Sequence, residues 1–216
     1  FNTCDGNAVT NGYVEGSIGN GLTFYSLVTD GMFNINVLSC NVNVPISITG
    51  YDYDNLQTTG EINYTLTSPE TNLGSLATCD TIEEFIQYSI DNGETLYFFE
   101  NIDVNFGSNE TPPTLTVYGS NNPDTQGCFY LYGVLDTTFS NYEGVYNNVD
   151  WNSTSTGFTL NECQDISNTN NLIEYNLSSF GSATGEYIDL NFGGAYEDSQ
   201  GVAHTITGVI HVKRDN

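Results

Sequence analysis

The stretch TDGMFNINVLSCNVNVPISITG, residues 29–50, contains two runs of alternating apolar and polar residues, one on each side of Cys40. Alternation with a period of two is the pattern of a β-strand that buries one face. The first run places Phe33, Ile35 and Val37 on one face, and the second run does the same with Val42, Val44, Ile46 and Ile48.

Two sequence features indicate where these runs turn or meet a sheet edge. Asp30 and Gly31 predict a turn before the first run. Pro45 predicts that part of the second run lies at a sheet edge, because proline has no N–H to donate to a neighbouring strand. The stretch therefore indicates the centre of a β-sandwich.

Charge is the extreme feature of the composition. The 216 residues include 27 Asp and Glu but only 2 Lys and Arg, a formal net charge of −25. This charge disfavours nucleic acid, anionic membranes and phosphate-rich ligands as partners. It is typical of a protein in a salty exterior, where ions screen self-repulsion, although divalent-cation binding is an alternative. No run approaches the roughly 20 apolar residues of a membrane span, and no signal peptide is present, so we expect a mature or trimmed chain.

The five cysteines are widely spaced, and none forms the CxxC pair of a zinc site. Such spacing in an acidic, turn-rich chain indicates disulfides and an oxidising exterior. We predict a Cys128–Cys163 disulfide, whose loop closure would contribute roughly 4 kcal/mol. We also predict Cys40–Cys79, although Cys4 could replace either partner. The remaining thiol is either free or paired with a segment outside this chain.

Four short segments carry a family resemblance: CDGNAVTNGYV (4–14), TDGMFNINV (29–37), SITGYD (47–52) and TNLGSLATC (71–79). In this order they resemble the carboxypeptidase regulatory-like domain, a transthyretin-like β-sandwich. The resemblance implies a first domain over residues 1–79. It also implies a bacterial context, because such modules serve as spacers and recognition domains in surface lipoproteins and outer-membrane receptors. The family's first strand begins several residues before the equivalent of Cys4. We therefore expect another chain, or an upstream segment, to add a strand beside residues 7–18.

Residues 80–94, DTIEEFIQYSIDNGE, permit a helix or a strand. A capping box formed by Asp80 and Glu83 would begin a helix. The alternative is a strand over residues 84–90, followed by a turn at residues 91–93 and a return over residues 95–99. We favour the strand because Ile86, Tyr88 and Ile90 alternate and the turn signal is strong.

Further strands are predicted in the second half at 103–106, 114–118, 128–135, 157–160, 172–177, 185–192 and 203–212. The ending, from GEYIDLNFGG to VIHVKRDN, is similar to the C-terminal module of secreted bacterial lipoproteins with a transthyretin-like domain. The predicted fold class is all-β, with two consecutive β-sandwich domains at residues 1–79 and 80–216.

Three residues are candidates for calcium binding. Asp52 and Asp54 alternate in an extended segment, which would put both carboxylates on one side, and Asn55 could add an oxygen. The alternative is a solvated loop. Calcium is the only cofactor that we predict, and its role would be structural.

Aromatic residues in a turn-rich segment are candidates for sugar stacking: Tyr142, Tyr146 and Trp151. The alternative is that they belong to the core, as most aromatic residues of a sandwich do. His204 and His211 lie seven residues apart in one predicted strand, so we expect them on opposite faces and without a shared metal ion. His204 has the same parity as Ile206 and is expected to pack at the strand's end.

The chain has no Gly-x-Ser-x-Gly motif, and nothing singles out a pair of carboxylates for glycoside hydrolysis. We predict a non-catalytic extracellular protein, secreted or exposed at a bacterial outer membrane, with a structural or adhesive role. It could be a subunit of a larger assembly or fibre completed by a neighbouring strand. The alternative is a glycan-binding accessory protein of a bacterial nutrient-uptake system.

Overall fold

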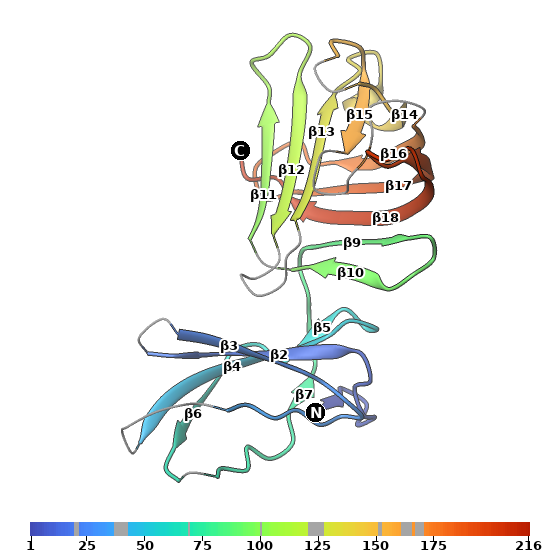
Figure 1. Ribbon diagram of the computed structural model, residues 1–216. Coiled ribbons are helices and arrows are strands. Elements are labelled where there is room, and N and C mark those ends of the chain that lie inside the picture. The colour runs from blue at the N-terminus through green and yellow to red at the C-terminus, as the bar shows by residue number, and fades with distance from the viewer. Residues whose placement is uncertain are drawn as a thin grey trace. The chain divides into compact units, whose positions relative to one another are not determined.

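The computed structural model describes residues 1–19, 22–36, 43–68, 70–99, 101–120, 128–150, 153–160, 166 and 171–216 (Figure 1). Within these ranges the only helical element is the three-residue 3-10 turn η1 (Ser140–Tyr142). The predicted all-β fold class is therefore confirmed. The chain divides into two compact units, Phe1–Ile82 and Glu83–Asn216, which are described separately.

The main sheet of the first unit has the order β3-β2-β4-β5-β8, and β6 also pairs with β4. A separate parallel pair joins the beginning of the unit to its end. The strands of the sheet are β2 (Gly12–Ile18), β3 (Leu22–Leu27), β4 (Val44–Asp52), β5 (Gln57–Thr58), β6 (Ile62–Leu66) and β8 (Asp80–Thr81), and the parallel pair is β1 (Asn2–Thr3) with β7 (Ala77–Thr78).

The second run of the stretch 29–50 forms the central strand β4, as predicted. Val44, Ile46 and Ile48 are buried, and the residues between them are exposed or half-buried. The ladder with β2 ends at the pair Ile18–Ile46, so among the described residues Pro45 has one cross-strand neighbour, Thr65 of β6. Proline therefore stands where its missing N–H costs no bond to β2.

The first run behaves differently. Residues 33–36 keep the predicted alternation, with Phe33 and Ile35 half-buried against the core, but they belong to no strand. The Phe33 ring instead meets the Phe1 ring edge-on, with the centroids 6.2 Å apart. The predicted turn before this run is present, because Asp30 and Gly31 have positive φ angles of 50° and 72° and Thr29 pairs with Met32. Val37, Cys40 and Val42 lie outside the described residues.

Other strands of the same unit lie beside residues 7–18, where the sequence predicted a strand added by another chain or an upstream segment. Strand β2 is paired with β3 on one side and with β4 on the other. The residues before it are also bonded: the amino group of Phe1 donates to the carbonyl of Gly31, and the N–H of Val9 donates to the carbonyl of Phe1. Among the described residues, both edges of β2 are therefore paired by the chain itself.

A disulfide joins Cys4 to Cys79, with the two Cα atoms 4.8 Å apart. This corrects the predicted Cys40–Cys79 pair and supports the alternative in which Cys4 takes the place of Cys40. The reason is the parallel register of β1 and β7, which pairs Asn2 with Ala77 and Thr3 with Thr78 and so brings the next cysteines together. Cys128 is also disulfide-bonded, whereas Cys163, its predicted partner, lies outside the described residues.

The second unit contains two sheets that share one buried core. Figure 1 shows the strands β11 to β13 running across the direction of β16 to β18. The six-stranded sheet, in spatial order, is β10 (Thr95–Phe98), β9 (Phe85–Ile90), β18 (Ala203–Lys213), β17 (Tyr187–Glu197), β16 (Leu172–Phe180) and β14 (Gly144–Asn147). The four-stranded sheet is β11 (Ile102–Gly107), β12 (Thr114–Ser120), β13 (Cys128–Val134) and β15 (Gly157–Leu160).

Every strand predicted for this unit is present, and the strand interpretation of residues 84–90 is confirmed over the helix. Strand β14 was missed, because it lies within the turn-rich segment NYEGVYNNVDWNST (141–154), whose composition indicates a loop. The last residues of the chain protect the edge strand β11: the Asp215 carboxylate accepts from the N–H of Val104 at 2.7 Å, and the side-chain oxygen of Asn216 accepts from the N–H of Phe106 at 2.8 Å.

Candidate functional site

The outward face of the six-stranded sheet carries a depression of about 180 Å³. It crosses the three adjacent strands β10, β9 and β18, so its floor is one continuous hydrogen-bonded ladder. Its lining residues are Gln87, Tyr88, Ser89, Thr95, Tyr97, Thr207, Gly208 and Val209.

Cross-strand register explains why the sheet is hollow there. Ser89 pairs with Thr95 on one side and with Thr207 on the other, which gives a row of three short hydroxyl side chains. The next row on the same face lies two residues further along each strand. It consists of Tyr97, Gln87 and Val209. The depression lies where the short row borders the longer one.

The lining is mostly polar, and none of its described residues carries a charged side chain. The Ser and Thr hydroxyls each donate one hydrogen bond and accept up to two, and the amide of Gln87 both donates and accepts. Tyr97 contributes an aromatic wall, with its ring stacked near that of Phe99 at a centroid distance of 5.8 Å. This arrangement suits a small neutral ligand that carries several hydroxyl groups.

The same face carries a histidine–carboxylate pair further along β17 and β18. His211 and Asp189 are cross-strand partners, and Nδ1 of His211 is hydrogen-bonded to Oδ1 of Asp189. The imidazole is stacked on Tyr187 with the ring centroids 4.3 Å apart, and Phe85 lies 5.5 Å away on β9. The carboxylate and the rings thus hold the imidazole in one orientation.

Lys213 lies beside this pair and makes two contacts of its own. It forms an ion pair with Glu83, and its ammonium lies 5.5 Å from the centroid of the Tyr187 ring. The hydrogen bond between them raises the pKa of Lys213 and lowers the pKa of Glu83. Arg214, the other basic residue, lies over the Phe106 ring at 4.9 Å and donates to the carbonyl of Gly181 at 2.7 Å.

His204 joins two turns of the second unit. Its Nδ1 lies 2.7 Å from the Asp91 carboxylate in the β9–β10 turn, and its Nε2 lies 3.5 Å from Asp198 in the β17–β18 turn. Asp91 also accepts from the N–H of Thr205 at 2.8 Å. The hydrogen bond to Asp91 raises the pKa of His204, and the same bond lowers the pKa of Asp91. His204 and His211 are thus held by different carboxylates.

The predicted calcium ligands do not converge. Asp52 is buried, and its Oδ1 accepts from the N–H groups of Asp54 and Asn55 at 3.1 and 3.2 Å. Its Oδ2 accepts from the side-chain amide of Asn55 at 2.8 Å. The Asp54 carboxylate is exposed and accepts from Asn11 at 3.0 Å. The Asp52 carboxylate therefore stabilises its own turn, and no group of three or more His, Cys, Asp or Glu in the described ranges is arranged to hold a metal ion.

The predicted sugar-stacking cluster is corrected by burial. Tyr146 is only 3% exposed, and its hydroxyl donates to the carbonyl of Tyr142 at 2.6 Å. Burial raises the pKa of Tyr146. Tyr142 is half-buried, with its ring edge-on to Phe180 at 5.2 Å. Tyr146 thus belongs to the core and cannot stack on a sugar at the surface, while Trp151 lies outside the described residues.

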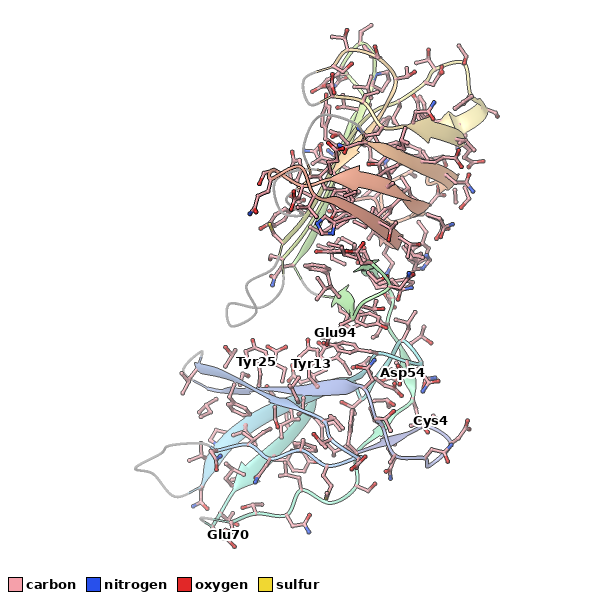
Figure 2. The ribbon with its side chains drawn as sticks, turned by 45° about the vertical axis from the view of Figure 1, so that its right-hand side comes forward. Cys4, Tyr13, Tyr25, Asp54, Glu70 and Glu94 are labelled. Carbon is pink, nitrogen blue, oxygen red and sulfur yellow. A yellow bond between two sulfur atoms is a disulfide. The ribbon has the colours of Figure 1, made fainter. Side chains whose placement is uncertain are left out.

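The sequence did not single out the residues of the depression, although it placed them in predicted strands. The only local signal was the polar half of the alternation in β9 and β18. The first unit holds a second aromatic group that was also missed: Tyr13 stacks on Tyr51 at 4.7 Å and lies 6.2 Å from Tyr25. Figure 2 shows Tyr13 and Tyr25 on the same side of the β2–β3 pair.

Comparison with protein-family models, with curated proteins and with solved structures finds no match to the chain. The transthyretin-like resemblance therefore stays a prediction. No helix in the part of the chain that the structure describes is long and apolar enough to cross a membrane.

Proposed function

We propose that the protein is a non-catalytic, extracellular surface protein with a structural or adhesive role, and that copies of it associate through the edge strand β3. The observation that carries this proposal is an apolar, uncharged sheet edge in a chain of net charge −25. The proposed site of strand addition is therefore β3, and not residues 7–18 as the sequence indicated.

Strand β3 lies at the end of its sheet and, among the described residues, pairs only with β2. Leu22 is 59% exposed and Leu27 is 78% exposed. The row Tyr51–Tyr13–Leu27 crosses β4, β2 and β3 and ends at this edge. An added strand would extend that row and cover Leu27, which favours association by apolar burial.

Natural sheets usually protect their edges with charged residues or proline. The sequence of β3, LTFYSL, has neither, and residues 16–29 contain no charged residue although the chain has 27 carboxylates. The strand itself therefore brings no carboxylate to the edge; the carboxylate of Glu15, on the neighbouring strand β2, accepts from the hydroxyl of Tyr25 at 3.3 Å. Two β3 strands can meet about a two-fold axis without repulsion between carboxylates of the strands, as an isologous interface requires.

An extracellular location is supported by the Cys4–Cys79 disulfide, since disulfides persist mainly in oxidising compartments. The large negative charge agrees with a salty exterior, where the Debye length is about 10 Å or less.

Sedimentation velocity over a range of protein and salt concentrations tests the association. We expect a dimer to grow with protein concentration and, because salt screens the repulsion between copies, with salt. The double variant Leu22→Lys/Leu27→Lys should stay monomeric. Its matched control is Val145→Lys/Val202→Lys, which adds the same charge at two other exposed aliphatic residues, 52% and 50% exposed. A parent that is monomeric throughout, or a Leu22/Leu27 variant that associates like the control, would contradict the proposal.

A second candidate function is glycan binding in nutrient uptake. The polar depression on the second unit supports it, and this depression replaces the predicted aromatic cluster as the candidate glycan site. The two candidates are compatible, because β3 belongs to the first unit and the depression to the second.

A further inference from the structure

We infer that the depression over β10, β9 and β18 is a binding site for a single sugar residue of a neutral glycan. This inference rests on the second candidate function and names the site and the ligand class that the candidate lacked.

The size of the depression limits the ligand. Its volume of about 180 Å³ is below the roughly 300–1,000 Å³ of pockets that enclose drug-sized ligands. The site can therefore receive one ring of a larger molecule and leave the rest in solvent, as the recognition of one residue in a glycan chain requires.

The chemistry of the lining selects a neutral, hydroxylated ligand. Ser89, Thr95 and Thr207 present hydroxyl groups from three strands, and Gln87 adds an amide. Groups that both donate and accept match sugar hydroxyls, which also do both. Tyr97 and Val209 provide apolar surface for the C–H groups of the ring.

Charge excludes the competing ligand classes. Among the described residues no carboxylate lines the depression, although the chain has 27 of them, so the lining brings no negative charge to hold a cation. None of the described lining residues is basic either, and the net charge of −25 repels anions. A neutral ligand is the class that remains.

The backbone holds the polar groups in place. Strand β9 is hydrogen-bonded to β10 through residues 86–89 and to β18 through residues 85–90. Beneath the lining, Ile86 and Ile210 are fully buried. Sites on paired strands keep their geometry better than sites on loops, so little ordering is needed when the ligand binds.

The test uses the full chain and two probe sets. Saturation-transfer NMR would screen neutral monosaccharides, with glucuronate as an anionic comparison, and titration calorimetry would screen neutral polysaccharides. We expect a neutral sugar to bind and glucuronate not to bind.

Three variants locate the site. Thr207→Val removes one hydroxyl with little change in shape and should weaken binding about 2- to 12-fold, the loss expected for one hydrogen bond. Ser89→Phe fills the depression and should abolish binding, with circular dichroism to check the fold. Thr116→Val is the matched control, since it removes a half-buried threonine hydroxyl from the outward side of the other sheet, and it should bind like the parent.

The inference is overturned if no neutral sugar of a broad panel binds, or if Thr207→Val and Ser89→Phe bind as the parent does. Equal losses in Thr116→Val and Thr207→Val would also overturn it. A panel without any binder would remove the second candidate function, whereas binding that ignores the site variants would remove only this site. Association through β3 is measured separately and is unaffected by either result.

Discussion

At the scale of single residues, His204 shows how the few titratable cations of this chain are used. It lies between Asp91 and Asp198, whose turns belong to different hairpins of the six-stranded sheet. The pKa of His204 is raised by its bond to Asp91, and the pKa of Asp198 is lowered mainly by the N–H of Val202. When it is protonated, the imidazole between two carboxylates ties the two turns together.

This contact should depend on pH. A histidine with a raised pKa stabilises the fold fully below its unfolded pKa of about 6.5 and loses that contribution as the pH rises through the folded pKa. The two carboxylates set the lower limit of the pH range. Their pKa values are lowered in the folded state, so their contribution to stability is lost only as the pH falls through those folded pKa values. The contact is therefore strongest between about pH 4 and about pH 6.5.

The measurement is thermal unfolding of the parent and of His204→Gln at about pH 5.5 and about pH 8. We expect the parent to melt higher than the variant at the lower pH, with the difference shrinking at the higher pH. The general repulsion of the acidic chain cancels in this comparison. Asp91→Asn is the control and should remove most of the difference. A difference that is the same at both pH values would contradict the assignment.

At the scale of elements, the short pair β1–β7 closes the first unit. Each strand has two residues, yet the N–H of Asn2 donates to the carbonyl of Leu76 at 2.8 Å and Thr78 is fully buried. The Cys4–Cys79 disulfide follows this pair and spans 75 residues of sequence. A two-residue ladder is weak by itself, so the covalent link accounts for its persistence.

Replacing both cysteines, Cys4→Ser/Cys79→Ser, should destabilise the first unit by roughly 4.5 kcal/mol, the loop-closure value for a loop of 75 residues. Urea unfolding would measure it, with hydrogen exchange of amides from each unit used to separate the units. The second unit, whose core contains neither residue, is the internal control. It should unfold at the same urea concentration in the variant as in the parent. A loss below about 1 kcal/mol would mean that the native contacts hold the ends without the bond.

Elements also show how far sequence reasoning reached. Alternation is a local property, and it predicted β4 and all but one of the strands of the second unit. It did not reveal which backbone lies beside a strand. Residues 33–36 alternate as a strand does but pack on the core without a ladder, and the Cys4–Cys79 pair depends on two strands too short to have a pattern.

The site was harder to predict for the same reason. Tyr146 looked like a surface residue in a turn-rich segment, but the short strand β14 buries it. The depression is built from Ser89, Thr95 and Thr207, which only cross-strand register brings together. No spacing in the sequence links a residue near position 90 to one near position 207.

At the scale of the whole molecule, charge decides where two copies can meet. The formal charge of −25 opposes association between copies in general, whereas β3 is uncharged and has exposed leucines at both ends. Association through this edge would join two sheets by backbone hydrogen bonds, with the repulsion weakened by salt. The central claim is that β3 is the edge that pairs.

Hydrogen–deuterium exchange of the full chain at low and high protein concentration, in high salt, tests that claim most directly. We predict that amides of β3 (Leu22–Leu27) become protected as the concentration rises, while those of the edge strand β14 (Gly144–Asn147) keep the same exchange rates. Protection of β14 in place of β3, or no change at either edge at concentrations where the protein is dimeric, would contradict it.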